Sequence, residues 1–252
     1  MATVTETVSS RSTYHVVQVR TPFVCLFHWV MVLSVVALCL TGLYIGNPRF
    51  LAGQGEAYAT FVMAKIRFIH FVAAYTLVVS LLLRLYHSFS PTTRHDIMDI
   101  IPTPKNVKAA LKLMYFFVTG KGEHLHYRQV NPLGGMSVFV TVCLFAVMAT
   151  TGFTLYSMQA NAITWRWMAW FPFLVERIFF GMSNVRLVHH LSMYALLSVV
   201  VIHVYMTVYM DIVFKEGEIA SIIGGYKVFH EDVVDLKEGD VRRPRLNRAP
   251  QF

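Results

Sequence analysis

Four long apolar stretches recur along the chain, and none of them contains Asp, Glu, Lys or Arg: residues 23–46, 68–83, 135–157 and 187–210. A helix needs about 20 predominantly apolar residues to cross the hydrocarbon core of a bilayer. With their flanks, the stretches predict four helices at about residues 23–46, 66–88, 135–157 and 187–213. The pattern therefore predicts an all-α integral membrane protein, with a four-helix transmembrane domain over residues 21–213 and polar tails at 1–20 and 214–252.

Composition agrees with a membrane environment. Of the 252 residues, 56% are hydrophobic and only 14% are charged, and the mean hydropathy is +0.52, outside the usual range of soluble domains. The three cysteines, Cys25, Cys39 and Cys143, all lie in apolar stretches without the CxxC spacing of zinc or iron–sulfur sites. We interpret them as small apolar core residues, so any iron–sulfur cluster must belong to a partner protein.

The basic residues are distributed unevenly between the two faces of the predicted bundle. Of 22 Lys and Arg residues, fifteen lie in the first twenty residues, the loop 88–134 and the tail after Asp211, against six in the other loops. Because cytoplasmic loops carry the excess of Lys and Arg, we expect both termini in the cytoplasm. The net charge of +8 then reflects topology, and no nucleic-acid partner is expected because no recognition motif accompanies the basic residues.

Two segments outside the spans are predicted to be interfacial helices. In residues 106–118, Lys108 and Lys112 oppose a row of apolar side chains, as in a helix that lies at a membrane surface. Residues 162–180 carry three Trp and four Phe residues, typical of the lipid–water boundary. The apolar face of this second segment would equally suit binding of another protein's membrane segment.

Histidines supply the candidate chemistry. Ionisable side chains within a membrane are costly and usually functional, although a lone histidine also serves as a hydrogen-bonded contact between helices. His189 and His203 are fourteen residues apart, which on a helix is about 21 Å of rise and roughly the same face. Six histidines lie within or at the edge of predicted spans: His28, His70, His87, His189, His190 and His203.

The expected topology sorts four of these histidines into two levels. The first helix starts in the cytoplasm, so His28 lies near the inner surface, whereas the second starts outside, so His70 lies near the outer surface. The fourth also starts outside, which places His189 with His70 and His203 with His28. Paired imidazoles are axial ligands of haem iron and leave no position open for substrate. The pattern therefore predicts two bis-histidine haems that transfer electrons.

Two further residues fit these levels. Gly42 follows His28 by fourteen residues, so a flat macrocycle would pack on it at the outer level, although transmembrane glycines also permit close helix contact. Arg84 follows His70 by fourteen residues and would reach a haem propionate at the inner level, or extend to the cytoplasmic boundary. His190 points about 100° away from His189, so it is not expected to be a ligand, and neither is His87.

Several segments resemble the b-type cytochrome subunits of nickel-iron hydrogenases. The first helix contains CLFHWV at 25–30 and LTG at 40–42, the second RFIHF at 67–71, the fourth RLVHHL at 186–191 with His203 at the expected spacing, and the tail IIGGY at 222–226. The resemblance covers roughly residues 14–230. Cys25 stands where that family usually has arginine, and Leu187, Tyr194 and Val199 also depart from its pattern.

The resemblance implies a di-haem cytochrome b in the cell inner membrane that anchors the small and large hydrogenase subunits on the outer face. Electrons would pass from the small subunit's clusters to a haem held by His70 and His189, then to one held by His28 and His203, and finally to quinone near the inner haem. Hydrogen oxidation would take place in the partner. The alternatives are a formate dehydrogenase cytochrome b, a haem-free anchor and a proton-coupled carrier.

Overall fold

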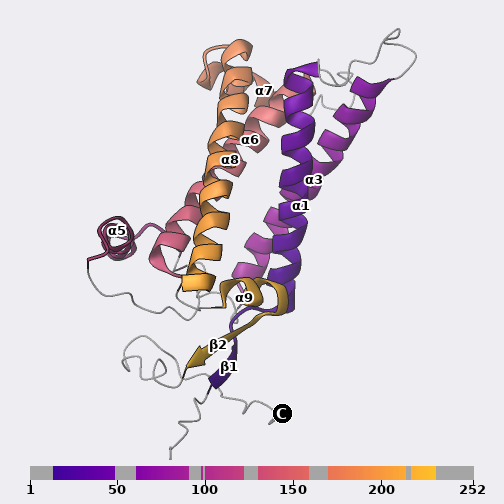
Figure 1. Cartoon of the computed structure of the whole chain (residues 1–252). Helices are drawn as coiled ribbons and strands as arrows, with labels where there is room; N and C mark the ends of the chain where they lie inside the picture. The colour runs from indigo at the N-terminus through magenta and orange to yellow at the C-terminus, as the bar shows by residue number, and fades with distance from the viewer. Residues whose placement is uncertain are drawn as a thin grey trace, which may run out of the picture.

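The computed structural model describes residues 14–48, 61–90, 98, 100–121, 130–158, 170–213 and 217–230. Four of its helices are long and apolar enough to cross a membrane: α1 (Pro22–Gly46), α3 (Val62–Ser88), α6 (Pro132–Ser157) and α8 (Met182–Val213). They alternate in direction (Figure 1). The predicted four-helix transmembrane bundle is confirmed.

Three helices begin at a capping side chain followed by proline, and not at the point where the charged residues of the sequence stop. Thr21, Thr103 and Asn131 each accept a hydrogen bond from a backbone N–H three residues later, at 3.4, 3.2 and 2.6 Å, and each is followed by proline. An oxygen-bearing N-cap with proline at the first helical position is a strong start signal. Consequently α6 begins at Pro132 and not at the predicted residue 135. Likewise α8 begins at Met182, because Arg186 does not interrupt it.

The spans form two pairs, α1 with α3 and α6 with α8 (Figure 1). The pairs meet in an apolar layer built on Leu77 of α3, Phe145 of α6 and Leu196 of α8. Val35 and Leu38 of α1 pack against this layer. All four spans therefore contribute to one core layer at mid-height.

This layer lies midway between the two histidine levels. Seven residues make about two helical turns, or about 10.5 Å of rise. On α8, Leu196 is seven residues from both His189 and His203. The same spacing repeats in Val35, between His28 and Gly42, and in Leu77, between His70 and Arg84.

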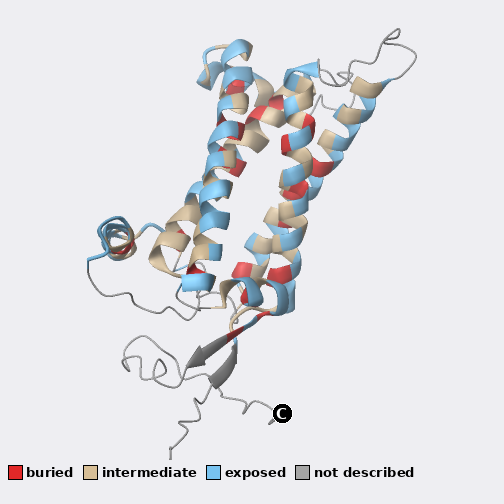
Figure 2. Cartoon of the chain, in the orientation of Figure 1, coloured by how far each residue is buried: buried red, intermediate tan, exposed pale blue. Residues whose placement is uncertain are grey.

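Outward faces of the spans are apolar and exposed. On α1, Leu26, Leu33 and Leu40 repeat every seven residues, and Leu33 is 68% exposed. Figure 2 shows exposed positions along the outer faces of all four spans. Cys143 is exposed as well, so its predicted place in the core is wrong, whereas Cys25 and Cys39 are buried. A continuous exposed apolar surface of this extent requires lipid around it.

Two shorter helices flank the bundle. Helix α5 (Pro104–Thr119) packs beside α6 and runs across the direction of the spans (Figure 1). Helix α7 (Trp170–Ile178) lies at the end of the bundle away from α9, Glu218–Gly224 (Figure 1). Helix α5 covers the predicted segment 106–118 and extends past it at both ends, and α7 falls within the predicted segment 162–180. Trp165 and Trp167 lie outside the described residues.

The chain ends meet in a short ribbon that the sequence analysis did not predict. Strand β1 (Tyr14–Gln18) pairs antiparallel with β2 (Tyr226–His230), next to α9 (Glu218–Gly224). The sequence analysis treated both segments as parts of polar tails. The ribbon lies below the spans in Figure 1, and we call this end of the bundle the ribbon end and the opposite one the α7 end.

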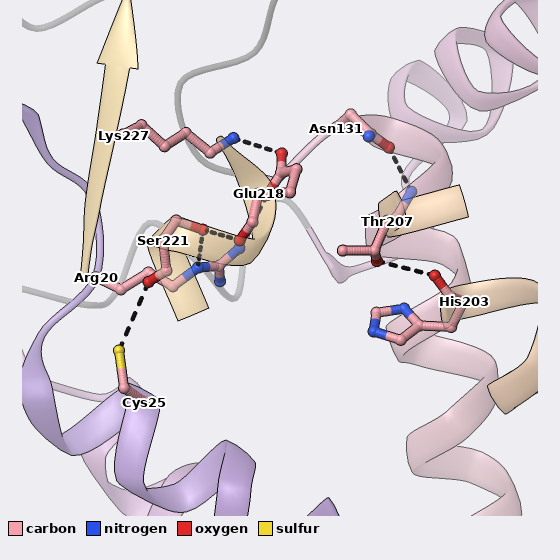
Figure 3. Close-up of polar contacts among 9 residues, drawn as sticks. Arg20, Cys25, Asn131, His203, Thr207, Glu218, Ser221 and Lys227 are labelled. Carbon is pink, nitrogen blue, oxygen red and sulfur yellow. Dashed lines mark hydrogen bonds and ion pairs between the residues drawn. The ribbon is translucent and has the colours of Figure 1, made fainter. Parts of the chain in front are cut away.

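A polar network fixes the ribbon end to the spans (Figure 3). Arg20 Nε donates to Ser221 Oγ (3.3 Å), and its guanidinium lies 3.6 Å from Glu218 Oε2. Glu218 also pairs with Lys227, which is fully buried. Cys25 Sγ donates to the Ser221 carbonyl (3.6 Å). Two cations therefore share one carboxylate at the start of α1.

Gly225 is the tightest backbone contact of this network. Its φ is +85°, and a Cβ at this position would lie 2.7 Å from the Arg20 carbonyl oxygen. We expect Gly225→Ala to destabilise the fold by more than the about 1–2 kcal/mol that a left-handed backbone alone costs. Gly120→Ala is the matched control, because Gly120 has φ +67° but nothing within 4 Å. Thermal denaturation midpoints in detergent would test this, and equal shifts in both variants would contradict it.

Candidate haem sites

A cavity of about 610 Å³ lies between the two helix pairs, on the α7 side of the apolar layer. All four spans line it, mostly with apolar side chains such as Phe71 and Met193. Its floor includes Leu77 and Leu196. An apolar cavity with a few convergent polar groups is the usual form of a cofactor site. The polar groups include His70, His189, His190, Arg67 and Arg186.

Thr41 sets the protonation of His70 across the α1–α3 contact. Thr41 Oγ1 lies 2.8 Å from His70 Nδ1 and 2.6 Å from the Ala37 carbonyl oxygen. A hydroxyl has one hydrogen, and the carbonyl of its own helix takes it. The oxygen must therefore accept from His70 Nδ1–H, which leaves the Nε2 lone pair available for a metal.

Thr151 repeats this arrangement for His189 across the α6–α8 contact. Thr151 Oγ1 lies 2.9 Å from His189 Nδ1 and 2.6 Å from the Val147 carbonyl oxygen. Thr151 is fully buried, so water does not compete for the hydroxyl. His189 therefore also carries its proton on Nδ1 and keeps the Nε2 lone pair.

A glycine follows each of these threonines and lets the imidazole approach the helix. A Cβ on Gly42 would lie 3.5 Å from His70 Cε1, and one on Gly152 would lie 3.1 Å from His189 Cε1. Gly42 lines the cavity, at the level that the sequence analysis predicted. A Thr-Gly dipeptide in each helix pair thus cradles one histidine.

These features fit a haem. Two imidazoles with available Nε2 lone pairs, from α3 and α8, line the same apolar cavity. The side of Gly42 that lacks a Cβ faces one of them, His70. Arg67 and Arg186 supply cations for carboxylates. When bound, a haem supplies an iron that takes up and releases one electron.

His28 and His203 lie on the ribbon side of the apolar layer and interact electrostatically with each other. Arg20 acts electrostatically on both of them. Within the described residues, His28 Nδ1 is buried and has no hydrogen-bond partner. The structure therefore brings these two histidines together, but gives His28 none of the threonine support seen at the other level.

Arg84 contacts a side chain of its own helix, whereas His87 packs against side chains of α1. The Arg84 guanidinium donates to Ser88 Oγ on the next turn of α3, and Ser88 Oγ donates back to the Arg84 carbonyl (2.9 Å). The His87 ring packs 6.1 Å from the Phe23 ring and 6.3 Å from that of Phe27.

A family model described as prokaryotic cytochrome b561 matches residues 19–225. The chain belongs to this family. Membership brings haem b and electron transport with it, and the cavity and its histidines fit that cofactor. The protein is thus a multi-pass membrane cytochrome b.

Relatives agree with the resemblance found in the sequence. A probable Ni/Fe-hydrogenase B-type cytochrome subunit of Azotobacter vinelandii is 34% identical over 220 residues, covering 83% of this chain and 88% of that protein. The subunit of the same name from Cupriavidus necator is 30% identical, covering 82% and 84%. The probable Ni/Fe-hydrogenase 1 B-type cytochrome subunit of Escherichia coli is 28% identical, covering 84% and 91%. The family assignment made from the sequence is confirmed.

Thr151 and Gly152 were not predicted as site residues, and Thr41 appears in the sequence only within the LTG motif at 40–42. The available signal was the Thr-Gly dipeptide, which occurs within two spans, at 41–42 and 151–152, and once outside them, at 119–120. Neither dipeptide lies near its histidine in the sequence, because the contacts span 29 and 38 residues. Only the helix pairing reveals them.

The two glycines predict different responses to an added methyl group. Gly152→Ala forces the His189 ring to move, since 3.1 Å is tighter than an ordinary contact, whereas 3.5 Å at Gly42 is ordinary. We expect Gly152→Ala to weaken haem binding by about 1–3 kcal/mol, as overpacking does, and Gly42→Ala to stay near wild type. Haem content per purified polypeptide measures this, and equal losses in both variants would refute it.

Proposed function

We propose that this protein is the di-haem cytochrome b subunit of a membrane-bound nickel-iron hydrogenase. It anchors the hydrogenase and transfers electrons from the small subunit's iron–sulfur clusters through two b haems to quinone. The observation that carries this proposal is the pair of oriented imidazoles, His70 and His189, that face one apolar cavity from different helices. The names of the relatives support the hydrogenase partner.

The proposed iron ligands are two pairs. His70 and His189 hold the haem on the α7 side, and His28 and His203 hold the haem on the ribbon side. The two levels are separated by about four helical turns of α8, or about 21 Å of rise. Two successive haems at this spacing would carry an electron across most of the hydrocarbon core.

Charge distribution supports the orientation of the complex. The ribbon pairs Tyr14–Gln18 with Tyr226–His230, and the sequence has most of its Lys and Arg in the first twenty residues, the loop 88–134 and the tail after Asp211, so we place the ribbon end in the cytoplasm. The α7 end then faces the outside of the cell inner membrane, where the small and large hydrogenase subunits bind. Exposed aromatic side chains of this end, Trp170, Phe173 and Phe180, suit contact with lipid or with the small subunit's membrane segment. Hydrogen oxidation takes place in those subunits.

Quinone is the proposed electron acceptor and binds near the ribbon-side haem. This location follows from the direction of transfer, away from the partner. A quinone photolabel is expected to mark residues of the ribbon end. Labelling confined to the loops of the α7 end would contradict this placement.

Haem content per polypeptide tests the ligand assignment. We expect two haems in the wild-type protein by pyridine haemochrome, and one each in His70→Ala and His203→Ala, because a bis-imidazole haem loses one of its two protein ligands. His87→Ala is the control and should keep two haems, since that ring packs against Phe23 and Phe27. Two haems in every variant would refute the ligand assignment.

The electron donor distinguishes the hydrogenase proposal from a formate dehydrogenase partner. In the complex isolated through a tag on this chain, hydrogen is expected to reduce the haems and formate is not. Addition of a soluble quinone should reoxidise them. Reduction by formate alone would indicate a formate dehydrogenase partner in place of a hydrogenase, and the haem assignment would stand.

A further inference from the structure

We propose that Thr41 and Thr151 are positioning residues that lower the midpoint potential of the α7-side haem. This inference rests on the proposed ligand role of His70 and His189. It assigns to the two threonines a redox function beyond holding helices together. The ribbon-side haem, which lacks this support at His28, is then expected to have the higher potential of the two.

The effect acts through the axial imidazoles. A hydrogen bond accepted from the Nδ1–H of a ligating histidine fixes the ring and makes it a more basic ligand. A more basic ligand stabilises ferric over ferrous iron, so the potential falls. Hydrogen bonding to axial ligands is one of the general means by which a protein tunes a haem.

Thr41 and Thr151 are constrained to be acceptors. Each hydroxyl donates its hydrogen to a carbonyl of its own helix at 2.6 Å and faces Nδ1 at 2.8 or 2.9 Å. A hydroxyl in this position cannot reverse the bond and leave the imidazole without its Nδ1 proton. Both axial ligands of one haem are therefore polarised in the same direction, within an apolar region where hydrogen bonds are strong.

The ribbon level lacks this polarisation at His28. His28 Nδ1 has no hydrogen-bond partner among the described residues, so no described acceptor makes this imidazole a more basic ligand. Arg20 acts on both His28 and His203, but Glu218, which pairs with Arg20, acts on His203 in the opposite direction. The difference in hydrogen bonding between the levels then favours electron flow from the α7 level to the ribbon level, the direction required of a subunit that delivers electrons to quinone.

Potentiometric titration of the purified complex tests the inference. Valine carries a methyl group where threonine carries its hydroxyl, so Thr41→Val and Thr151→Val each remove one acceptor with little change in side-chain shape. We expect the midpoint potential of the α7-side haem to rise in each variant and to rise further in the double variant, while the ribbon-side haem stays unchanged. The α7-side haem is identified as the one that His70→Ala loses.

Two further variants control for packing. Thr154 is fully buried on the same helix as Thr151, and its hydroxyl donates to the Thr150 carbonyl at 2.8 Å. Thr154→Val should therefore leave both potentials at the wild-type values. Thr41→Ser restores a hydroxyl and should return the potential to that of the wild type. The low-spin ferric EPR signal of the α7-side haem should shift in the two valine variants only.

The possible failures are distinguishable. If the valine variants keep two haems with wild-type potentials, or if Thr154→Val shifts a potential equally, the threonine inference is overturned and the proposed function stands. If His70→Ala keeps both haems, the proposed ligand assignment fails, and the threonine inference fails with it. If Thr41→Val assembles without haem, the midpoint potential is measured in Thr151→Val, which removes the acceptor of His189, the other proposed ligand of the same haem.

Discussion

The apolar layer of Leu77, Phe145 and Leu196 is the contact on which the rest of the structure depends. It joins two helix pairs that enclose a cavity on one side and hold a second pair of histidines on the other. Because the layer lies two turns from each histidine on α8, the same packing fixes the depth of both levels. Side chains close-packed at this height leave little freedom for the pairs to shift, so the levels keep their separation.

A buried imidazole N–H needs a hydrogen-bond acceptor, and Thr41 and Thr151 supply one to His70 and His189 without adding charge. An unsatisfied buried donor costs about 1–3 kcal/mol, and a carboxylate acceptor would itself need a partner in the membrane. A threonine whose hydrogen is already donated to its own helix offers a neutral acceptor. Glycine at the next position then permits the ring to lie against the helix wall. The result is an oriented ligand at low electrostatic cost.

Spans, histidine levels and the role of Gly42 as a cavity residue were predictable, because hydropathy and helical periodicity are local properties of the sequence. Contacts that join distant segments were not. The Thr41–His70 and Thr151–His189 bonds depend on which helices pair, and the ribbon joins residues more than 200 positions apart. Periodicity also gives the depth of Arg84, whose guanidinium donates to Ser88 Oγ on the same helix, and its role toward a haem propionate stays a prediction. The contacts of Arg20 were also not predicted, because Arg20 lies before the first span and its partners lie in α9.

The pairing of β1 with β2 has a consequence for biosynthesis. Arg20 leaves the ribosome about 200 residues before the groups that hold it, Glu218, Ser221 and the Gly225 carbonyl. All four spans are thus translated before β2 can pair with β1. The Thr41–His70 and Thr151–His189 contacts need no residue beyond α8, so they can form before the contacts at Arg20. A chain truncated before residue 218 would keep all four candidate ligands but lose the groups that hold Arg20.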